Sequence, residues 1–165
     1  MINMKTFKKL IPYMLIIIVV ILIRSFIITP AIVNGDSMEK TLKDGEVMIV
    51  NKMFMKIDKL SRYDIVVIEK GDEYIVKRVV GLPGEHIVYK DNKLYADDLL
   101  ITSELTFEKT KDFEVFQVPA NSYYVLGDNR DVSSDSRTFG SVNESLIVGK
   151  VNFVLFPFSR FGMVK

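Results

Sequence analysis

The chain has 165 residues, of which 48% are hydrophobic and 26% are charged, and its formal net charge is +1. This near-neutral balance gives no support to nucleic-acid binding, which usually shows as a strongly basic domain. The absence of cysteine and the presence of a single histidine, His86, exclude disulfides, cysteine nucleophiles and multi-histidine metal sites. We expect neither a metal ion nor a cofactor.

The N-terminal part of the chain is dominated by one long apolar segment. "LIPYMLIIIVVILIRSFII" (10–28) has 19 residues, and 14 of them are Leu, Ile, Val or Phe. As a helix it would be about 28 Å long, close to the hydrocarbon thickness of a bilayer. Arg24 lies near its C-terminal end, where the side chain can reach the headgroups. The run is longer than that of a cleaved signal peptide and no clear small-x-small site follows it, so residues 1–29 are predicted to form a permanent anchor.

The orientation of this anchor is predicted from the lysines on its two sides. Lys5, Lys8 and Lys9 precede the apolar segment, whereas Lys40 and Lys43 follow it at a greater distance. By the positive-inside rule, this modest excess places the N-terminus in the cytoplasm. We therefore expect a single-pass protein of the cell membrane, held in the lipid bilayer, whose residues 30–165 form an extracytoplasmic domain.

From residue 30 onward the sequence is a series of short strand-forming runs. They are rich in Val, Ile, Tyr and Phe, and Gly, Pro, Asp and Asn separate them. "KDNK" (90–93) has the composition of a hairpin turn, and "SELTFEKTKD" (103–112) that of an exposed loop. No later stretch keeps a helical period for three turns. The predicted fold class is mostly β, with one antiparallel coiled-sheet or barrel-like domain after the N-terminal transmembrane helix.

A short turn with a serine follows the first predicted strand in "NGDSMEKTL" (34–42). Gly35 permits positive φ or a close approach of backbone. Ser37 can then present its hydroxyl to a substrate beside free backbone N–H groups. The alternative is that Ser37 caps the N-terminus of a short helix. The local sequence leaves both interpretations open.

Two cations lie inside an apolar run in "EYIVKRVVGLPGE" (73–85). Because alternate residues of a strand face opposite sides, Lys77 and Arg78 point in opposite directions. One interpretation is an edge strand with one wet face. The other is a desolvated Lys77, whose pKa falls because burial disfavours the ammonium form. A neutral amine of this kind is a competent general base.

The segment "GDNRDVSSDSRTFG" (127–140) is dense in groups that can pair with one another. Its 14 residues include three Asp, two Arg, one Asn and three Ser. Asp and Arg side chains in this density can form a rigid hydrogen-bonded support for a site. The alternatives are a charged surface loop and a calcium loop, although Arg130 and Arg137 would oppose a bound cation.

Taken together, these motifs resemble those of type I signal peptidases, the membrane-bound Ser/Lys proteases of bacteria. "GDSM" (35–38) is similar to the nucleophile motif of that family, and "VKRVVGLPGE" (76–85) to its lysine motif. "RYDIVVI" (62–68) resembles its second conserved strand, and the segment 127–140 matches its last box position by position. The resemblance runs from the N-terminal anchor to at least Gly140, and the size is similar to the compact, single-anchor Gram-positive form.

The resemblance implies a serine endopeptidase that removes signal peptides from exported preproteins, after a small-x-small motif and close to the secretion translocon. It implies that Ser37 is the nucleophile, that Lys77 is the general base, and that the Ser133 hydroxyl orients the lysine. It also implies a supporting role for four residues of the last box, which are Asp128, Arg130, Asp135 and Arg137.

Two positions near Ser37 bear on how far the resemblance extends. Some members of the family have a serine where Gly35 stands, and its hydroxyl completes the oxyanion hole. Here, as in the Gram-positive type, the backbone N–H groups of Gly35 and Ser37 are expected to bind the oxyanion. Lys40 stands where the family commonly has proline, as in "SMxPTL".

Two other functions are compatible with parts of the sequence. Self-cleaving repressors also use a Ser/Lys pair, but they carry a DNA-binding module in place of a membrane helix. A membrane-tethered β module that binds exported proteins without cutting them is the alternative from a different class. The resemblance supplies no role for His86. "FPFSRFGM" (156–163) is either the end of a core strand or a segment that dips into the membrane interface.

Overall fold

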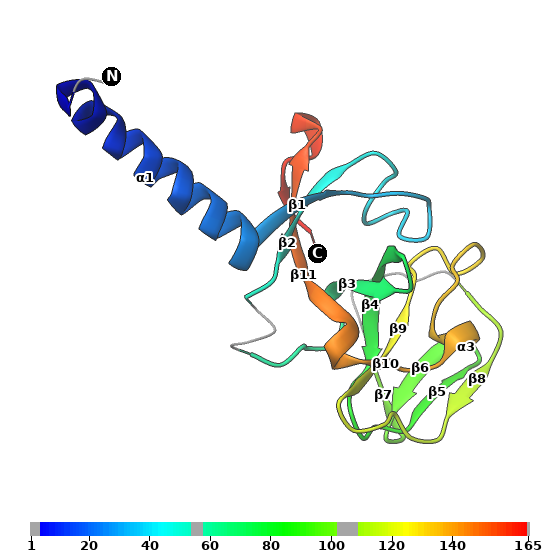
Figure 1. Ribbon diagram of the computed structural model, residues 1–165. Coiled ribbons are helices and arrows are strands. Elements are labelled where there is room, and N and C mark those ends of the chain that lie inside the picture. Colours follow the sequence, from blue (N-terminus) through cyan, green and yellow to red (C-terminus); the bar gives the residue numbers. More distant parts are fainter. Residues whose placement is uncertain (1–3, 54–57, 102–108, 165) are drawn as a thin grey trace.

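The structure is a computed structural model, and it describes residues 4–53, 58–101 and 109–164 of the chain. Its first element is the helix α1 (Met4–Phe26), which extends away from the rest of the protein as an arm (Figure 1). From Lys9 to Phe26 every side chain is exposed, and this stretch has a mean hydropathy of 2.2. By length and composition it is the one described helix that can span a membrane. A helix that is apolar on all sides and covered by no protein is suited to lipid.

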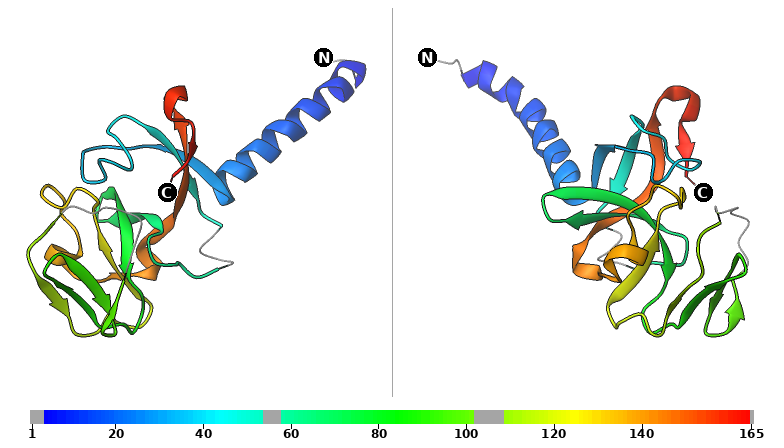
Figure 2. Two further views of the ribbon diagram at one scale, coloured as in Figure 1. Left: turned by 180° about the vertical axis from the view of Figure 1, so that it is seen from behind. Right: turned by 90° about the vertical axis from the view of Figure 1, so that its right-hand side faces the viewer.

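The larger of two antiparallel sheets has the strand order β1-β2-β11-β3-β4-β9-β10, with β12 paired to β11. The long strand β11 pairs with both β2 and β3, and its register shifts along both neighbours. Such irregularities bend a strand and increase its twist, and the sheet is visibly coiled (Figures 1 and 2). Its strands are β1 (Ile28–Ile32), β2 (Val47–Asn51), β3 (Ile65–Lys70), β4 (Glu73–Gly81), β9 (Ser122–Leu126), β10 (Val142–Asn143), β11 (Ile147–Phe156) and β12 (Gly162–Met163).

A smaller four-stranded sheet has the order β7-β6-β5-β8. Asp91 and Asn92 join two of its strands with φ values of 52° and 62°, which is the backbone of the tight turn predicted for "KDNK". The remaining elements are single turns of helix. The bounds are β5 (Ile87–Lys90), β6 (Lys93–Ala96), β7 (Leu99–Leu100), β8 (Phe113–Val115), α3 (Ser136–Phe139), η1 (Glu144–Leu146) and η2 (Phe158–Arg160).

The strand β3 shows why apolar runs without alternation occur in this sequence. Ile65 and Val67 belong to one buried cluster, which also contains Met38 from the turn after β1. Val66 and Ile68 point the other way and belong to a second cluster. Because both faces of the strand are covered, every position from 65 to 68 is apolar. A third cluster lies between β4, β9 and the smaller sheet.

Strand β4 lies inside the large sheet and carries both cations of the lysine motif. It pairs with β3 from Glu73 to Arg78 and with β9 from Arg78 to Gly81. Lys77 is 3% exposed and Arg78 is 1% exposed. Although residues 73–77 pair on one side only, neither cation faces water, so the interpretation of a wet face is wrong and Lys77 is desolvated.

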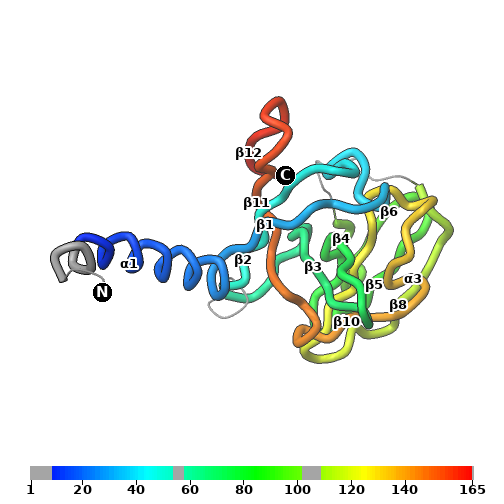
Figure 3. The backbone as a smooth tube through the Cα atoms, turned by 45° about the horizontal axis from the view of Figure 1, so that its top comes forward, coloured from blue at the N-terminus to red at the C-terminus, as the bar shows by residue number. Residues whose placement is uncertain are grey.

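The predicted class, mostly antiparallel β after one apolar helix, is confirmed. The loop predicted at 103–112 lies mainly outside the described residues. Figure 3 shows α1 leading directly into β1, and a single residue, Ile27, separates them. At the other end of the chain, the core-strand interpretation of 156–163 is wrong. The exposed apolar side chains of that segment are Phe156, Phe158, Phe161 and Met163.

Candidate active site

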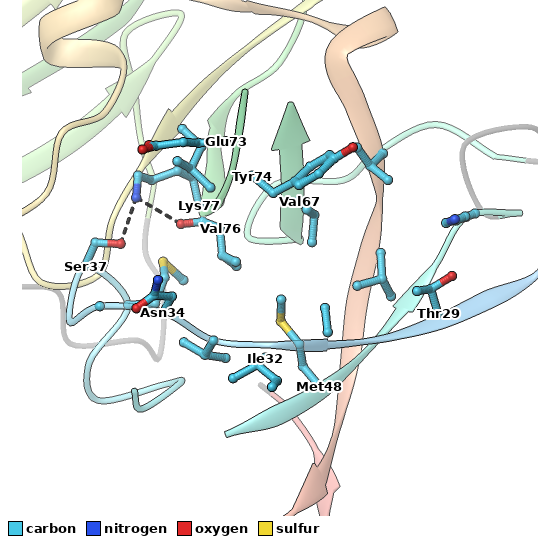
Figure 4. Close-up of a pocket in the computed structure, with 18 residues that line it drawn as sticks. Thr29, Ile32, Asn34, Ser37, Met48, Val67, Glu73, Tyr74, Val76 and Lys77 are labelled. Carbon is cyan, nitrogen blue, oxygen red and sulfur yellow. Dashed lines mark hydrogen bonds between the residues drawn. The ribbon is translucent and has the colours of Figure 1, made fainter. Parts of the chain in front are cut away.

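The side chains of Ser37 and Lys77 meet at one end of a groove (Figure 4). Lys77 Nζ lies 2.7 Å from Ser37 Oγ and 3.0 Å from the carbonyl oxygen of Val76, to which it donates. Ser37 does not begin a helix, because residues 37–41 form turns. The N-cap interpretation is therefore wrong, and the serine hydroxyl is directed to the lysine amine.

The surroundings of Lys77 favour the neutral amine. Burial lowers the pKa of Lys77 from 10.5 to about 8, and the positive charge of Lys70 acts in the same direction. The carboxylates of Asp135 and Asp128 oppose this change but do not cancel it. At pH 7 about one molecule in ten therefore carries a free amine next to the Ser37 hydroxyl. Such a pair can transfer a proton and activate the serine oxygen.

The last box holds the backbone of Ser37 through close contact. The N–H of Asn129 donates to the Ser37 carbonyl oxygen at 3.1 Å. Gly127 packs against the same carbonyl, and a Cβ atom at this position would lie 2.5 Å from the Ser37 oxygen. Only glycine fits a backbone approach of this kind. The position of Ser37 is therefore set by residues that follow it by some ninety positions in the chain.

A buried ion pair ties the turn after Ser37 to the lysine strand. Arg78 Nε and Nη2 donate to the two carboxylate oxygens of Asp128 at 2.8 and 2.7 Å, in a bidentate geometry. The hydroxyl of Thr41 donates to Asp128 and accepts from Arg78. The carbonyl oxygen of Tyr63 accepts from the remaining guanidinium nitrogen at 2.9 Å. Sequence reasoning missed Thr41 and the role of Arg78, because only the fold brings them to Asp128.

A second network surrounds Asp135, whose side chain is fully buried. Arg137 donates to both of its carboxylate oxygens at 2.8 Å, and the N–H of Gly127 donates at 3.0 Å. Burial by itself raises the pKa of Asp135, but hydrogen bonds from Arg137, Gly127 and Ser133 hold the pKa below its ordinary value. Arg137 also donates to the carbonyl oxygen of Arg130, whose own Nε donates to Gly127.

Among the described residues, the hydroxyl of Ser133 makes no hydrogen bond to Lys77, although the resemblance implies one. It is close enough to Asp135 to help lower that pKa, yet within the described residues no hydrogen bond of ordinary geometry satisfies it. Lys77 donates to Ser37 and Val76 instead. The buried Ser133 hydroxyl is therefore left available beside the site.

The expected oxyanion donors are only partly available. The N–H of Gly35 donates to Asp44 Oδ1 at 2.7 Å, so it is already engaged. The expectation that Gly35 offers a free N–H is therefore wrong for this structure. Within the described part of the chain, no hydrogen bond uses the Ser37 N–H. Sequence reasoning could not foresee the Asp44 contact, because it depends on how the turn folds back nine residues later.

The groove has a volume of about 600 Å³ and is lined mainly by apolar side chains from β1, β2 and β4. In the described structure, β1 pairs only with β2, and β4 pairs only with β3 as far as Lys77. Both strands therefore leave one edge unpaired, and unpaired edges can accept an extended peptide by backbone hydrogen bonds. His86 takes no part in this site, since it contacts Glu114 and Asp97 on the smaller sheet.

Comparisons with known proteins identify the family of this chain. A family model described as "Signal peptidase, peptidase S26" matches residues 6–156. Signal peptidase IB of Staphylococcus aureus (strain Mu50) is 39% identical over 165 residues, covering 87% of this chain and 86% of that protein. Signal peptidase I T of Bacillus subtilis (strain 168) is 40% identical over 163 residues, covering 90% and 84%.

A solved structure is similar as well. The crystal structure of a signal peptidase I from Enterococcus faecalis V583 superposes with a TM-score of 0.52 at 32% identity, covering 57% of this chain and 97% of that chain. The family match spans most of the chain, and both curated relatives exceed a third of identical residues over most of their length. The chain belongs to the signal peptidase family, peptidase S26.

Proposed function

We propose that the protein is a membrane-bound signal peptidase I that cuts signal peptides from secretory preproteins, with Ser37 as nucleophile and Lys77 as general base. The observation that carries this proposal is the 2.7 Å distance between Lys77 Nζ and Ser37 Oγ in a site where Lys77 is 3% exposed. A dry amine at hydrogen-bonding distance from an alcohol is the arrangement that general-base activation of serine requires.

In the first half of the reaction, the neutral amine of Lys77 takes the proton of the Ser37 hydroxyl. The Ser37 oxygen attacks the scissile carbonyl carbon, and the carbonyl oxygen gains the negative charge. The Ser37 N–H is the donor available to that oxygen, and one such donor contributes about 3 to 4 kcal/mol to the lowering of the barrier. The bond between carbon and nitrogen then breaks, and the Lys77 ammonium returns its proton to the amine of the mature protein.

The second half regenerates the enzyme. Water attacks the ester formed on Ser37 while Lys77 accepts one of its protons, and the signal peptide leaves as a carboxylic acid once Ser37 has recovered its hydrogen. Four residues of the last box are proposed to support this step without touching the substrate, because their contacts fix Ser37 and the strand that carries Lys77. They are Asp128, Arg130, Asp135 and Arg137. Ser133 is proposed to orient the amine of Lys77, as the family resemblance implies.

We propose that residues 1–29 anchor the protein with its N-terminus in the cytoplasm, and that residues 30–165 form the catalytic domain outside. The turn between β11 and β12 presents Phe158, which is 81% exposed, and Phe161, which is 57% exposed. Aromatic side chains gathered at such a tip are suited to the membrane interface. Contact of the catalytic domain with the bilayer would place the groove where secretory signal peptides emerge, near the translocon.

The test of the catalytic proposal is cleavage of a preprotein with an Ala-x-Ala cleavage site by the full chain in detergent. We expect Ser37→Ala and Lys77→Met each to lower the rate by about 10³-fold or more. Matched controls are Ser134→Ala and Lys93→Met, which change exposed residues of the same types and are expected to leave the rate unchanged. Cleavage that survives either change of the pair would exclude it. A parent chain without cleavage would favour the non-catalytic binding module.

The membrane contact has an independent test, because the chain contains no tryptophan. In protein reconstituted into vesicles, the tryptophan of Phe158→Trp is expected to fluoresce at a shorter wavelength than a tryptophan in water. Brominated lipids are expected to quench this fluorescence. Phe116→Trp is the control, since Phe116 is 86% exposed in the bend that follows β8 of the smaller sheet. Equal quenching of both probes, or of neither, would contradict a specific contact by the β11–β12 turn.

A further inference from the structure

The last hairpin of the chain reaches back to the turn that carries Ser37. Arg160, at the end of η2, donates from Nε to Glu46 Oε1 at 2.9 Å. Its Nη2 donates to the carbonyl oxygen of Thr41 at 2.9 Å. Arg160 lies beyond residues 6–156, where the family model matches. One guanidinium thus links the C-terminal hairpin to both ends of the segment 41–46.

Thr41 is held at two atoms by two different parts of the protein. Its carbonyl oxygen accepts from Arg160, whereas its hydroxyl bonds to Asp128 and Arg78. The N–H of Thr41 also donates to the carbonyl oxygen of Met38 at 3.1 Å, and this bond closes the turn directly after Ser37. Fixing Thr41 therefore limits how far the serine can move from Lys77.

Glu46 explains why an arginine is needed at this point. Its side chain is 4% exposed, and its second oxygen accepts from the N–H of Lys43 at 3.1 Å. A buried carboxylate requires a counter-ion, and Arg160 supplies one. The planar guanidinium can bond to a carboxylate and a carbonyl oxygen at the same time with little loss of conformational freedom.

We propose that Arg160 is a positioning residue for the reaction, because it holds the 41–46 segment in place and so keeps the Ser37 hydroxyl within hydrogen-bonding distance of the Lys77 amine. The inference rests on the proposed roles of Ser37 and Lys77. Within the described residues, no hydrogen bond of the Arg160 side chain reaches the groove or the pair, so Arg160 acts through Thr41 and Glu46. The exposed Phe158 and Phe161 flank it in sequence, so the hairpin that faces the membrane interface is also the element that holds the catalytic turn.

The experiment measures kcat and KM of the full chain in detergent with the same preprotein. Arg160→Ala is expected to lower kcat by about 10-fold while KM stays within about 2-fold, because a displaced serine reacts slowly but the groove is intact. Added methylguanidinium is expected to restore part of kcat, since the Arg160 side chain is 39% exposed and its place is open to a small cation.

The matched control is Arg62→Ala, which removes the arginine of another partly buried ion pair, with Glu85, that does not touch the catalytic turn. We expect it to leave kcat unchanged and to show no rescue. Because Arg160→Ala leaves Glu46 unpaired, Glu46→Leu combined with Arg160→Met provides a variant without the buried charge. Its thermal midpoint is expected to recover while kcat stays low.

Three results would overturn the positioning role while the parent chain is active. These are an unchanged kcat in Arg160→Ala, a parental kcat in the double variant, and an equal loss in Arg62→Ala. A raised KM with unchanged kcat would likewise contradict it, since the effect would then lie in substrate binding. If the parent chain itself failed to cleave the preprotein, the proposed function would be excluded instead.

Discussion

Gly127 and Ser133 approach each other so closely that no side chain fits at position 127. A Cβ atom there would lie 2.2 Å from Ser133 Oγ and 2.5 Å from Ser133 Cβ. The same atom would lie 2.5 Å from the carbonyl oxygen of Ser37. One missing methyl group therefore allows the turn with the nucleophile and the last box to pack together.

Replacing this glycine tests the packing directly. Gly127→Ala is expected to lower the free energy of unfolding by about 3 kcal/mol, because backbone and Ser133 must shift. We expect cleavage to fall by about 10²-fold, since Ser37 is displaced with its carbonyl. The measurements are chemical denaturation and preprotein cleavage. Gly71→Ala is the control, because it has positive φ but open space, and should cost only about 1 kcal/mol. Parental activity in Gly127→Ala would contradict the packing.

The rate is expected to depend on the protonation of Lys77. With a pKa of about 8, the reactive amine is the minor form at pH 7 and the major form above pH 8. The value of kcat/KM should therefore rise about tenfold per pH unit below pH 7 and level off above pH 8. The measurement is preprotein cleavage between pH 5 and 9. A flat profile across this range would show that Lys77 is not the base.

The same burial predicts that Lys77 destabilises the fold. Its pKa is about 8 when folded and 10.5 when exposed. Below pH 8 the folded protein must bury the ammonium, whereas between pH 8 and 10.5 it releases the proton before the unfolded chain does. Lys77→Met should therefore raise the free energy of unfolding by about 1 to 3 kcal/mol at pH 7. The gain should shrink as the pH approaches 10.5. Urea denaturation at pH 7 and pH 10 measures both values, and a loss of stability at pH 7 would refute this.

Replacing Lys40 by proline, the residue that the family commonly has at this position, is predicted to destabilise the protein. The φ of Lys40 is +89°, in the turn closed by the bond from Thr41 N–H to the Met38 carbonyl. Proline fixes φ near −65°, so Lys40→Pro is expected to destabilise the protein rather than to rigidify the turn. Lys40→Gly should instead stabilise it by about 1 kcal/mol. Thermal unfolding of both variants is the measurement, and a higher midpoint for Lys40→Pro would disprove the described turn.

Local patterns were sufficient to predict the strands, and they marked Ser37 and Lys77 as candidates without deciding between their alternative roles. Apolar runs such as Ile65–Ile68 identify buried strands, and an ammonium within such a run, Lys77, has few structural explanations. The meeting of Lys77 with Ser37, 40 residues apart, depends on strand order. Only the motif resemblance indicated it beforehand.

The features that sequence reasoning missed depend on the path of the folded chain. Arg160 is separated from Thr41 by 119 residues, and an arginine between exposed phenylalanines has no local signature of such a bond. Asp44 engages the N–H of Gly35 because the turn folds back on itself. Lys40 stands at positive φ although neither lysine nor proline favours it. In each case the chain path decides the contact, and composition does not encode the path.

Under the proposed function, the junction between α1 and β1 sets the height of the active site above the membrane. Ile27 alone separates helix from strand, and the Thr29 hydroxyl donates back to the Arg24 carbonyl oxygen at 2.9 Å. The chain from Ile28 to Ser37 can span at most about 30 Å. The anchor and β1 then limit the distance between the membrane and Ser37. A preprotein would be cleaved only if its own apolar helix places the scissile bond at that distance from the lipid, in addition to having suitable residues around the bond.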